Sequence, residues 1–334
     1  MTTERPRHFP PPPPLAPPPG LWRRTPPAIF PPVMGLLGLG LGWRFFGQIT
    51  GLETLAALAE MLLGAAVLLY GFCAVAWLAK PLRRPGVLID ELRILPGRAG
   101  MAAGVLGLSL VAAVLVPYAP GLAQGLVLLA MLLLAALGAL VAWVLLAGPQ
   151  EQRMVTPVFH LIFVGYILAP LSLVPLGQLG VARLIFWVTL ALALMIWAAS
   201  AWQLARRVPP APLRPLLAIH LAPASLLATV AAMLGWGMVS AGSAVLALAI
   251  LLALVGAGRW LLAAGFSPLW GALTFPLAAC GAAQLYAFGA YPAGVMLGAG
   301  LLLAASALTL TVLWRVLQAW ARGQLAARTN AATA

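Results

Sequence analysis

Long apolar segments of about twenty residues follow one another along almost the whole chain, separated by short breaks that carry Gly, Pro and Arg. An apolar segment of about 20 residues is long enough to cross a bilayer as an α-helix. The weakest breaks lie near Gly235 and Pro268, so nine and eleven spans are alternatives to ten. We expect ten transmembrane helices, at residues 27–46, 52–78, 99–117, 121–147, 155–176, 181–205, 214–235, 238–264, 267–288 and 293–320.

The composition agrees with this pattern, because 63% of the residues are hydrophobic and only 7% are charged. A water-soluble surface needs far more charged side chains, whereas lipid tails solvate Leu, Val and Ala directly. Unbroken apolar runs also differ from the short alternating segments of transmembrane β-barrels. The sequence therefore predicts an all-α polytopic membrane protein.

The two ends of the chain differ from this central part. Residues 1–26 are rich in proline and predict a disordered cytoplasmic tail, for which a docking site for a partner protein is the alternative. Residues 27–320 form the predicted ten-helix transmembrane domain, and residues 321–334 a cytoplasmic C-terminal tail.

Basic residues gather on one predicted side of the membrane, and only Arg44 and Arg183 fall on the other. Cytoplasmic loops of membrane proteins carry an excess of Lys and Arg, so we expect both termini in the cytoplasm. This topology accounts for the net charge of +13 without a nucleic-acid partner. The residues on the basic side are Arg23, Arg24, Lys80, Arg83, Arg84, Arg93, Arg98, Arg153, Arg206, Arg207, Arg214, Arg259, Arg315, Arg322 and Arg328.

Prolines stand at or near the first half of each odd-numbered predicted helix, and the even-numbered helices lack them. A proline bends a helix and frees a carbonyl, which a membrane protein tolerates beside other protein or water. We therefore expect five helical hairpins around a central pore, with the kinked odd-numbered helices inside. These prolines are Pro31, Pro32, Pro96, Pro157, Pro223 and Pro276.

Three segments carry a resemblance to a known family: Pro27–Arg44 (PAIFPPVMGLLGLGLGWR), Leu221–Ala224 (LAPA) and Leu269–Pro276 (LWGALTFP). Their order resembles that of the tellurite-resistance/dicarboxylate transporter family, over roughly residues 27–320. This family includes bacterial TehA-like channels, plant guard-cell slow anion channels, and fungal malate and sulfite transporters. The resemblance implies a multi-pass protein of a bacterial-type plasma membrane that moves small inorganic or organic anions, often as a homotrimer.

The resemblance also implies that one phenylalanine closes the pore near its middle, and Phe275 stands at the matching position. A ring across a dry constriction imposes a dewetting barrier on ions. Ordinary packing is the alternative role. The family often has a proline inside its third and fifth helices, where this chain has Leu106 and Ile162, with Pro170 later in the fifth. We therefore expect a narrower or differently bent pore.

Glu60 is the one acidic residue well inside a predicted span, where an unpaired carboxylate costs roughly a few kcal/mol. Arg44, at the outer end of the preceding helix, is its nearest candidate partner. We expect a structural ion pair that braces the first hairpin. A role as the coupling-proton site of a carrier, or a role in gating, is the alternative.

Other polar side chains in the odd-numbered helices are candidate pore-lining groups. His160 and His220 could meet across a cavity and bind an anion, or each could bond a neighbouring carbonyl. The hydroxyls could line the pore beside the prolines, or bond back to their own helices. The hydroxyl residues are Ser109, Ser172, Ser225, Thr229 and Thr274.

No inner helix carries Arg or Lys near its predicted middle, which favours channel-like passage of weakly hydrated anions. A Phe-gated anion channel or uniporter is thus the leading hypothesis. A proton-coupled carrier or exporter of dicarboxylate, sulfite or a tellurite-type oxyanion is one alternative. A haem- or metal-binding membrane protein with His160 and His220 as ligands is another. The sequence shows no catalytic triad, phosphate loop or Cys-x-x-Cys spacing, so we expect neither an enzyme nor a cofactor.

Overall fold

The computed structural model describes residues 20–333. This part of the chain is helical and contains no strand. Nine of its helices are long and apolar enough to cross a membrane, and a tenth apolar segment, His160–Leu173, is shorter. The prediction of an all-α polytopic membrane protein is confirmed.

The spans form two layers. Among the described helices, an 18-residue apolar stretch of each long inner span is 61% to 83% buried inside the protein, compared with 22% to 33% for the corresponding stretch of each outer helix. The inner spans are η2–α1 (Pro27–Ile29, Phe30–Thr50), α4 (Leu95–Leu115), η6–α8 (Ala211–His220, Leu221–Met233) and η7–α11 (Pro268–Trp270, Gly271–Phe288). The outer helices are α2 (Glu53–Arg83), α5 (Pro120–Ala147), α7 (Leu179–Arg206), α9 (Gly237–Gly256) and α12 (Pro292–Ala321).

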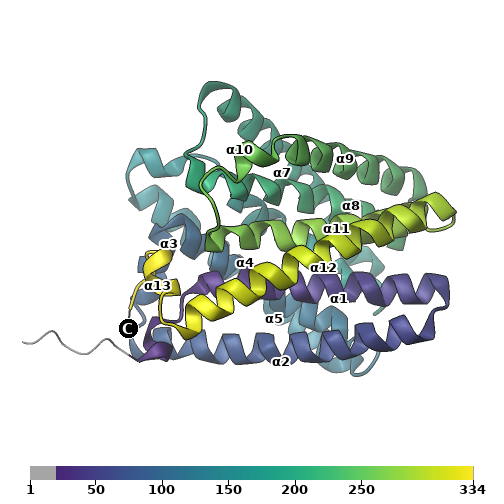
Figure 1. The fold of residues 1–334 in the computed structure, drawn as a ribbon, viewed down its shortest axis with the longest axis horizontal. Helices are drawn as coiled ribbons and strands as arrows, with labels where there is room; N and C mark the ends of the chain where they lie inside the picture. Colours follow the sequence, from purple (N-terminus) through teal and green to yellow (C-terminus); the bar gives the residue numbers. More distant parts are fainter. Residues whose placement is uncertain (1–19, 334) are drawn as a thin grey trace, which may run out of the picture.

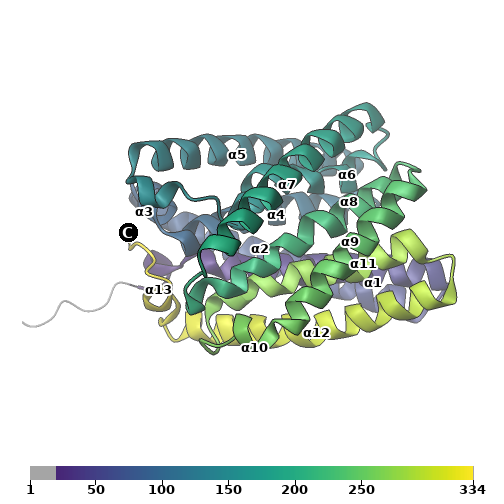
Figure 2. The same ribbon diagram turned by 90° about the horizontal axis from the view of Figure 1, so that it is seen from above.

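Each inner segment packs against the outer helix that follows it in sequence, which gives five consecutive hairpins. In Figure 1, α1 and α2 run side by side, and α12 crosses obliquely over α11. Seen from above in Figure 2, α5 and α7 cover another side of the bundle. The inner segments contact one another in the cyclic order α1, α4, the fifth segment, α8 and α11. The predicted ring of inner helices is therefore present.

The fifth inner segment is not the continuous helix expected at residues 155–176. It consists of a π-helix, η4 (His160–Val164), a 3₁₀ turn, η5 (Gly165–Leu168), and one short α-helix, α6 (Pro170–Leu173). Pro170 has no N–H and its ring crowds the carbonyl four residues earlier, so it favours a break in the helix just before it, and α6 begins at Pro170. This break explains why the segment is shorter than the other spans.

Prolines shape the inner layer mainly at helix starts. Pro31, Pro32 and Pro96 lie in the first turns of α1 and α4, where a missing N–H costs nothing. Pro276 lies inside α11. The expectation that even-numbered helices lack proline is wrong for three outer helices. The helix α2 extends past residue 78 to Arg83 and contains Pro81, and α5 and α12 begin at Pro120 and Pro292. The outer helix predicted to end at residue 264 also stops at Gly256, followed by α10 (Gly258–Leu261).

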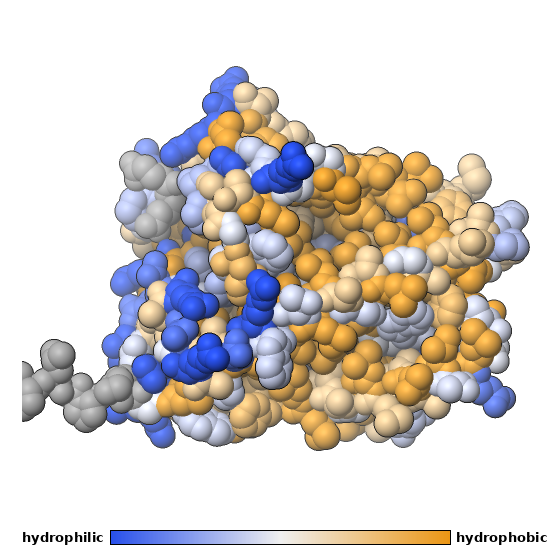
Figure 3. All heavy atoms as spheres, viewed as in Figure 1, coloured by the Kyte–Doolittle hydropathy of each residue, from blue (hydrophilic) through white to orange (hydrophobic). Residues whose placement is uncertain are grey.

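Both described ends of the chain lie at one end of the bundle, together with α3 (Val87–Arg93) and α13 (Leu325–Arg328) (Figure 1). Residues 1–19 of the predicted N-terminal tail lie outside the described residues. Residues 20–26 are ordered: η1 (Leu21–Arg24) leads to the buried Thr25, whose hydroxyl accepts a hydrogen bond from Trp320 Nε1 at 3.2 Å. Beyond residue 321, Leu325 and Thr329 are buried as well. Hydrophilic residues gather at this end, and the rest of this face is mostly hydrophobic (Figure 3).

Candidate functional site

Three cavities lie within the ring of inner segments. One of about 40 Å³ is lined by residues from the first turns of the inner spans, on the side of the chain ends. A second, of about 260 Å³, is lined by residues near the opposite ends of these spans, such as Gln48 and Tyr286. A third, of about 20 Å³, lies beside the fifth segment and α8. Phe275 lines all three cavities.

Phe275 is held by a glycine on one side and followed by a proline in its own helix. Its side chain is buried, and its ring lies so close to Gly38 of α1 that a Cβ on Gly38 would stand 2.6 Å from the ring atom Cδ2. Pro276 cannot donate to the carbonyl of Ala272, which lines the cavity on the side of the chain ends. The helix α11 therefore lacks one of its regular backbone hydrogen bonds beside the Phe275 ring.

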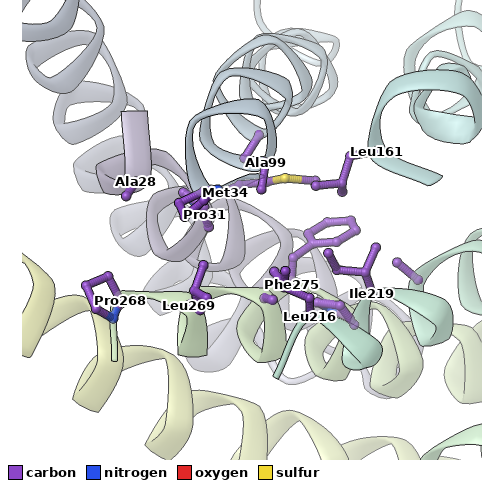
Figure 4. Close-up of a pocket in the computed structure, with 16 residues that line it drawn as sticks. Ala28, Pro31, Met34, Ala99, Leu161, Leu216, Ile219, Pro268, Leu269 and Phe275 are labelled. Atoms are coloured by element: carbon purple, nitrogen blue, oxygen red, sulfur yellow. The ribbon is translucent and has the colours of Figure 1, made fainter. Parts of the chain in front are cut away.

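Figure 4 shows the Phe275 ring pointing into the cavity, toward Leu161 and next to Ile219, with Met34 nearby. These side chains come from α1, the fifth segment, η6 and α11, so four of the five inner segments meet around the ring. All of them are apolar. The narrow part of the pathway is therefore a hydrophobic constriction.

The candidate hydroxyls mostly bond to their own helices. Ser225 donates to Leu221 O at 2.9 Å, and Thr229 donates to Ser225 O at 3.1 Å. Thr274 donates to Gly271 O at 2.8 Å. Of the predicted group, only Thr229 lines one of the three cavities, the one of 260 Å³, whereas Ser109 and Ser172 are buried away from them. Among the prolines, Pro31 and Pro276 line the cavity on the side of the chain ends. Pro223 lines the cavity of about 20 Å³, and Pro32 lines none of the three.

Arg44 and Glu60 form the ion pair expected from the sequence. Arg44 Nε and Nη2 each donate to one oxygen of Glu60 at 2.6 Å, and Arg44 Nη1 donates to Val114 O at 3.2 Å. The hydroxyl of Tyr118 donates to Glu60 Oε2 at 2.7 Å, and this bond raises the pKa of Tyr118. The pair links α1, α2 and the end of α4, and Arg44 also lines the 260 Å³ cavity.

His160 and His220 also meet: His160 Nε2 lies 2.9 Å from His220 Nδ1. The indole of Trp197 donates to His220 O at 3.2 Å, which fixes the backbone beside the pair. Two axial imidazole ligands on opposite sides of a haem iron need nitrogens about 4 Å apart, since each metal–N bond is about 2 Å. The rings do not fit a haem between them, and the described residues contain no cluster of three or more metal-ligating side chains.

Sequence reasoning missed the partners of Phe275 in the constriction. Met34, Leu161 and Ile219 are ordinary apolar residues within apolar segments, and no local pattern separates them from residues that face lipid. Gly38 carries a weak signal, because it belongs to the glycine repeat of the first span. Only the packing of the inner segments identifies these contacts.

A family model described as "Voltage-dependent anion channel" matches residues 24–317. No individual curated protein matches the chain. The matched range covers nearly all of the transmembrane domain, and the family is the one that the three sequence segments resemble. Its members are anion channels and transporters. The general function of this chain is therefore anion transport, and the chain is a membrane protein. The chain belongs to the voltage-dependent anion channel family.

Proposed function

We propose that this protein conducts small anions across the membrane through the pathway inside the inner ring, with Phe275 as the gate. The observation that carries the proposal is that the Phe275 ring borders all three cavities along this pathway. An apolar constriction excludes water, and an ion that loses its water meets a high barrier. In this state the ring closes the pore.

Charge supports an anion as the permeating species. Arg44 lines the cavity on one side of Phe275, and hydrophilic residues gather at the opposite end of the bundle (Figure 3). Basic residues at that end include Arg24 in η1, Arg83 at the end of α2 and Arg206 at the end of α7. A positive surface raises the local concentration of anions at a pore mouth. By the positive-inside rule, the end that holds the chain termini faces the cytoplasm of a bacterial-type cell. Assembly as a homotrimer rests on the family resemblance.

The proton-coupled carrier is the second candidate, and the geometry weakens one of its proton sites. Glu60 accepts from two Arg44 nitrogens and from Tyr118, so its carboxylate is stabilised in the charged form by three hydrogen bonds. The bonded pair of His160 and His220 remains as the candidate proton site, since His160 lines the cavity of about 20 Å³ beside the fifth segment and α8.

The test is anion flux in reconstituted liposomes, comparing the wild-type protein with Phe275→Ala for chloride, nitrate, malate and sulfite. Removing the ring lowers the barrier, and each 1.4 kcal/mol of lowering corresponds to roughly a tenfold rise in flux. Phe46→Ala is the matched control, because Phe46 is a buried ring of α1 that lines none of the three cavities. We expect a large rise in Phe275→Ala and none in Phe46→Ala.

Equal flux in wild type and Phe275→Ala, with both proteins folded, would refute the gate. Ionophores that set the membrane potential and collapse the proton gradient separate the two candidate functions. A channel follows the anion gradient and the voltage alone. Flux that stops when the proton gradient is removed would instead support the coupled carrier.

A further inference from the structure

Arg98, in the first turn of α4, is a buried cation with no counterion among the side chains that the structure describes. Arg98 is only 6% exposed, and its Nε and Nη1 atoms have no hydrogen-bond partner. A buried charge without an opposite charge is strongly disfavoured. Among the described acidic side chains, Glu60, Asp90 and Glu91 are paired with other cations, and Glu53 lies at the start of α2, on the opposite side.

Arg98 borders a cavity of about 410 Å³ on the side of the chain ends. The cavity lies between α4, the chain before η4, the end of α7 and η6. Thr156 and Ser200 also line this cavity, and their hydroxyl oxygens are buried without a hydrogen-bond partner. Arg207 lines the same cavity. All of these groups donate hydrogen bonds, so together they suit an acceptor that carries negative charge.

The rest of the cavity wall is apolar, with Leu95, Val155 and Leu213 among its residues. A volume of this size is typical of sites for small organic ligands and far exceeds the space of one water or halide. Leu216 lines both this cavity and the one that leads to Phe275. The cavity therefore adjoins the pathway on the side of the chain ends.

We propose that this cavity binds a small organic oxyanion, with its carboxylate or phosphate group on Arg98, Thr156 and Ser200 and its hydrocarbon part on the apolar wall. The bound anion supplies the counterion that Arg98 lacks. A further role, the loading of the permeating anion, rests on the proposed function, whereas the binding itself does not.

The first test is thermal unfolding of the detergent-solubilised protein in low-salt Tris buffer, with succinate, inorganic phosphate or further chloride added. A ligand that binds the folded state raises the unfolding midpoint as its concentration increases. We expect a saturable rise with succinate, a smaller one with phosphate and little response to chloride. Micelles doped with phosphatidylglycerol form a separate arm, because the phosphate of an anionic lipid has the same chemistry. A rise in that arm alone identifies the lipid headgroup as the occupant.

Arg98→Met separates this site from a merely structural arginine. The variant removes an unpaired buried charge, so we expect it to unfold at a higher temperature than the wild type without added anion and to lose the response to succinate. Arg214→Met is the control, since Arg214 is bonded to Pro209 O and Trp260 O and stacks on Trp260. It should lower the midpoint and keep the response.

The proposal fails if Arg98→Met keeps the wild-type response, if Arg98→Met is the less stable protein without anion, or if no probe shifts the wild-type midpoint. Flux provides an independent comparison. If Arg98→Met raises the half-saturating succinate concentration in Phe275→Ala liposomes, the site loads the pathway. If succinate still raises the unfolding midpoint but Phe275→Ala conducts no anion, the proposal that Phe275 is the gate is refuted, whereas the proposed anion site is supported.

Discussion

The ring of Phe275 lies against the backbone of Gly38, and these two residues join α11 to α1 at the constriction. The space between them is so small that any side chain on Gly38 would overlap the ring, whose Cδ2 and Cε2 atoms would lie 2.6 and 2.7 Å from a Cβ. Since real Cβ contacts are longer, the ring occupies its place only because residue 38 is glycine. The position of the proposed gate thus depends on two inner helices.

This contact predicts that Gly38→Ala destabilises the protein by about 1–3 kcal/mol, the usual cost of overpacking a dense interior. The cost should largely vanish in the Phe275→Ala background, because the atoms that the new methyl group meets are then absent. Unfolding midpoints of the four proteins in this double-mutant cycle measure the coupling. An equal loss of stability in both backgrounds would contradict the contact.

The ion pair of Arg44 and Glu60 predicts that Glu60→Gln lowers stability by about 1–2 kcal/mol, because charge-assisted bonds weaken and the partly exposed pair is screened by solvent. Glu53→Gln is the control, since Glu53 is exposed in the first turn of α2 and its loss costs only a few tenths of a kcal/mol. Thermal unfolding compares the two variants. Normal stability of Glu60→Gln, together with an altered pH dependence of flux, would favour a proton-coupling role.

A second ion pair is fully buried: Lys80 Nζ donates to Glu91 Oε1 at 2.5 Å, and both side chains have no exposed surface. Removing one partner leaves the other charge uncompensated, so Glu91→Leu should cost about 3–5 kcal/mol. The double variant Lys80→Met/Glu91→Leu should recover much of this loss. Asp90→Ala, in the exposed pairs with Arg84 and Arg93, should cost less than about 1 kcal/mol. Similar losses for Glu91 and Asp90 would show that the buried pair contributes little.

The bonded imidazoles predict that His160→Leu lowers stability by about 1–3 kcal/mol, because His220 Nδ1 loses its partner in a partly buried position. The double variant His160→Leu/His220→Leu should restore part of it. If the protein is a channel, anion flux through the double variant in the Phe275→Ala background should follow voltage as before. Loss of a proton-gradient dependence in this variant would instead identify the pair as the coupling site.

Much of the architecture follows from the sequence alone, because lipid as a solvent permits few solutions. Apolar segments that must satisfy their own backbone hydrogen bonds become helices, and their length and the placement of Arg fix the order of spans. The prolines correctly marked the inner layer at α1, α4, α8 and α11. The position of Glu60 also pointed to Arg44, because a carboxylate inside a span needs a cationic partner and Arg44 was the nearest candidate in the sequence.

Other features depended on contacts between segments far apart in the chain. The fifth segment reads as one apolar helix, yet it consists of π, 3₁₀ and α turns. Pro170 disfavours a regular helix there, but only the folded structure shows which kind of turn each part adopts. Tertiary packing also placed Met34, Leu161 and Ile219 around Phe275, and it left Arg98 without a counterion within the described part of the chain. Hydropathy reports only whether a residue prefers lipid or protein to water. Which apolar side chain faces a cavity, and which cation lacks a partner, is decided by the shapes of the surfaces that the folded helices bring together.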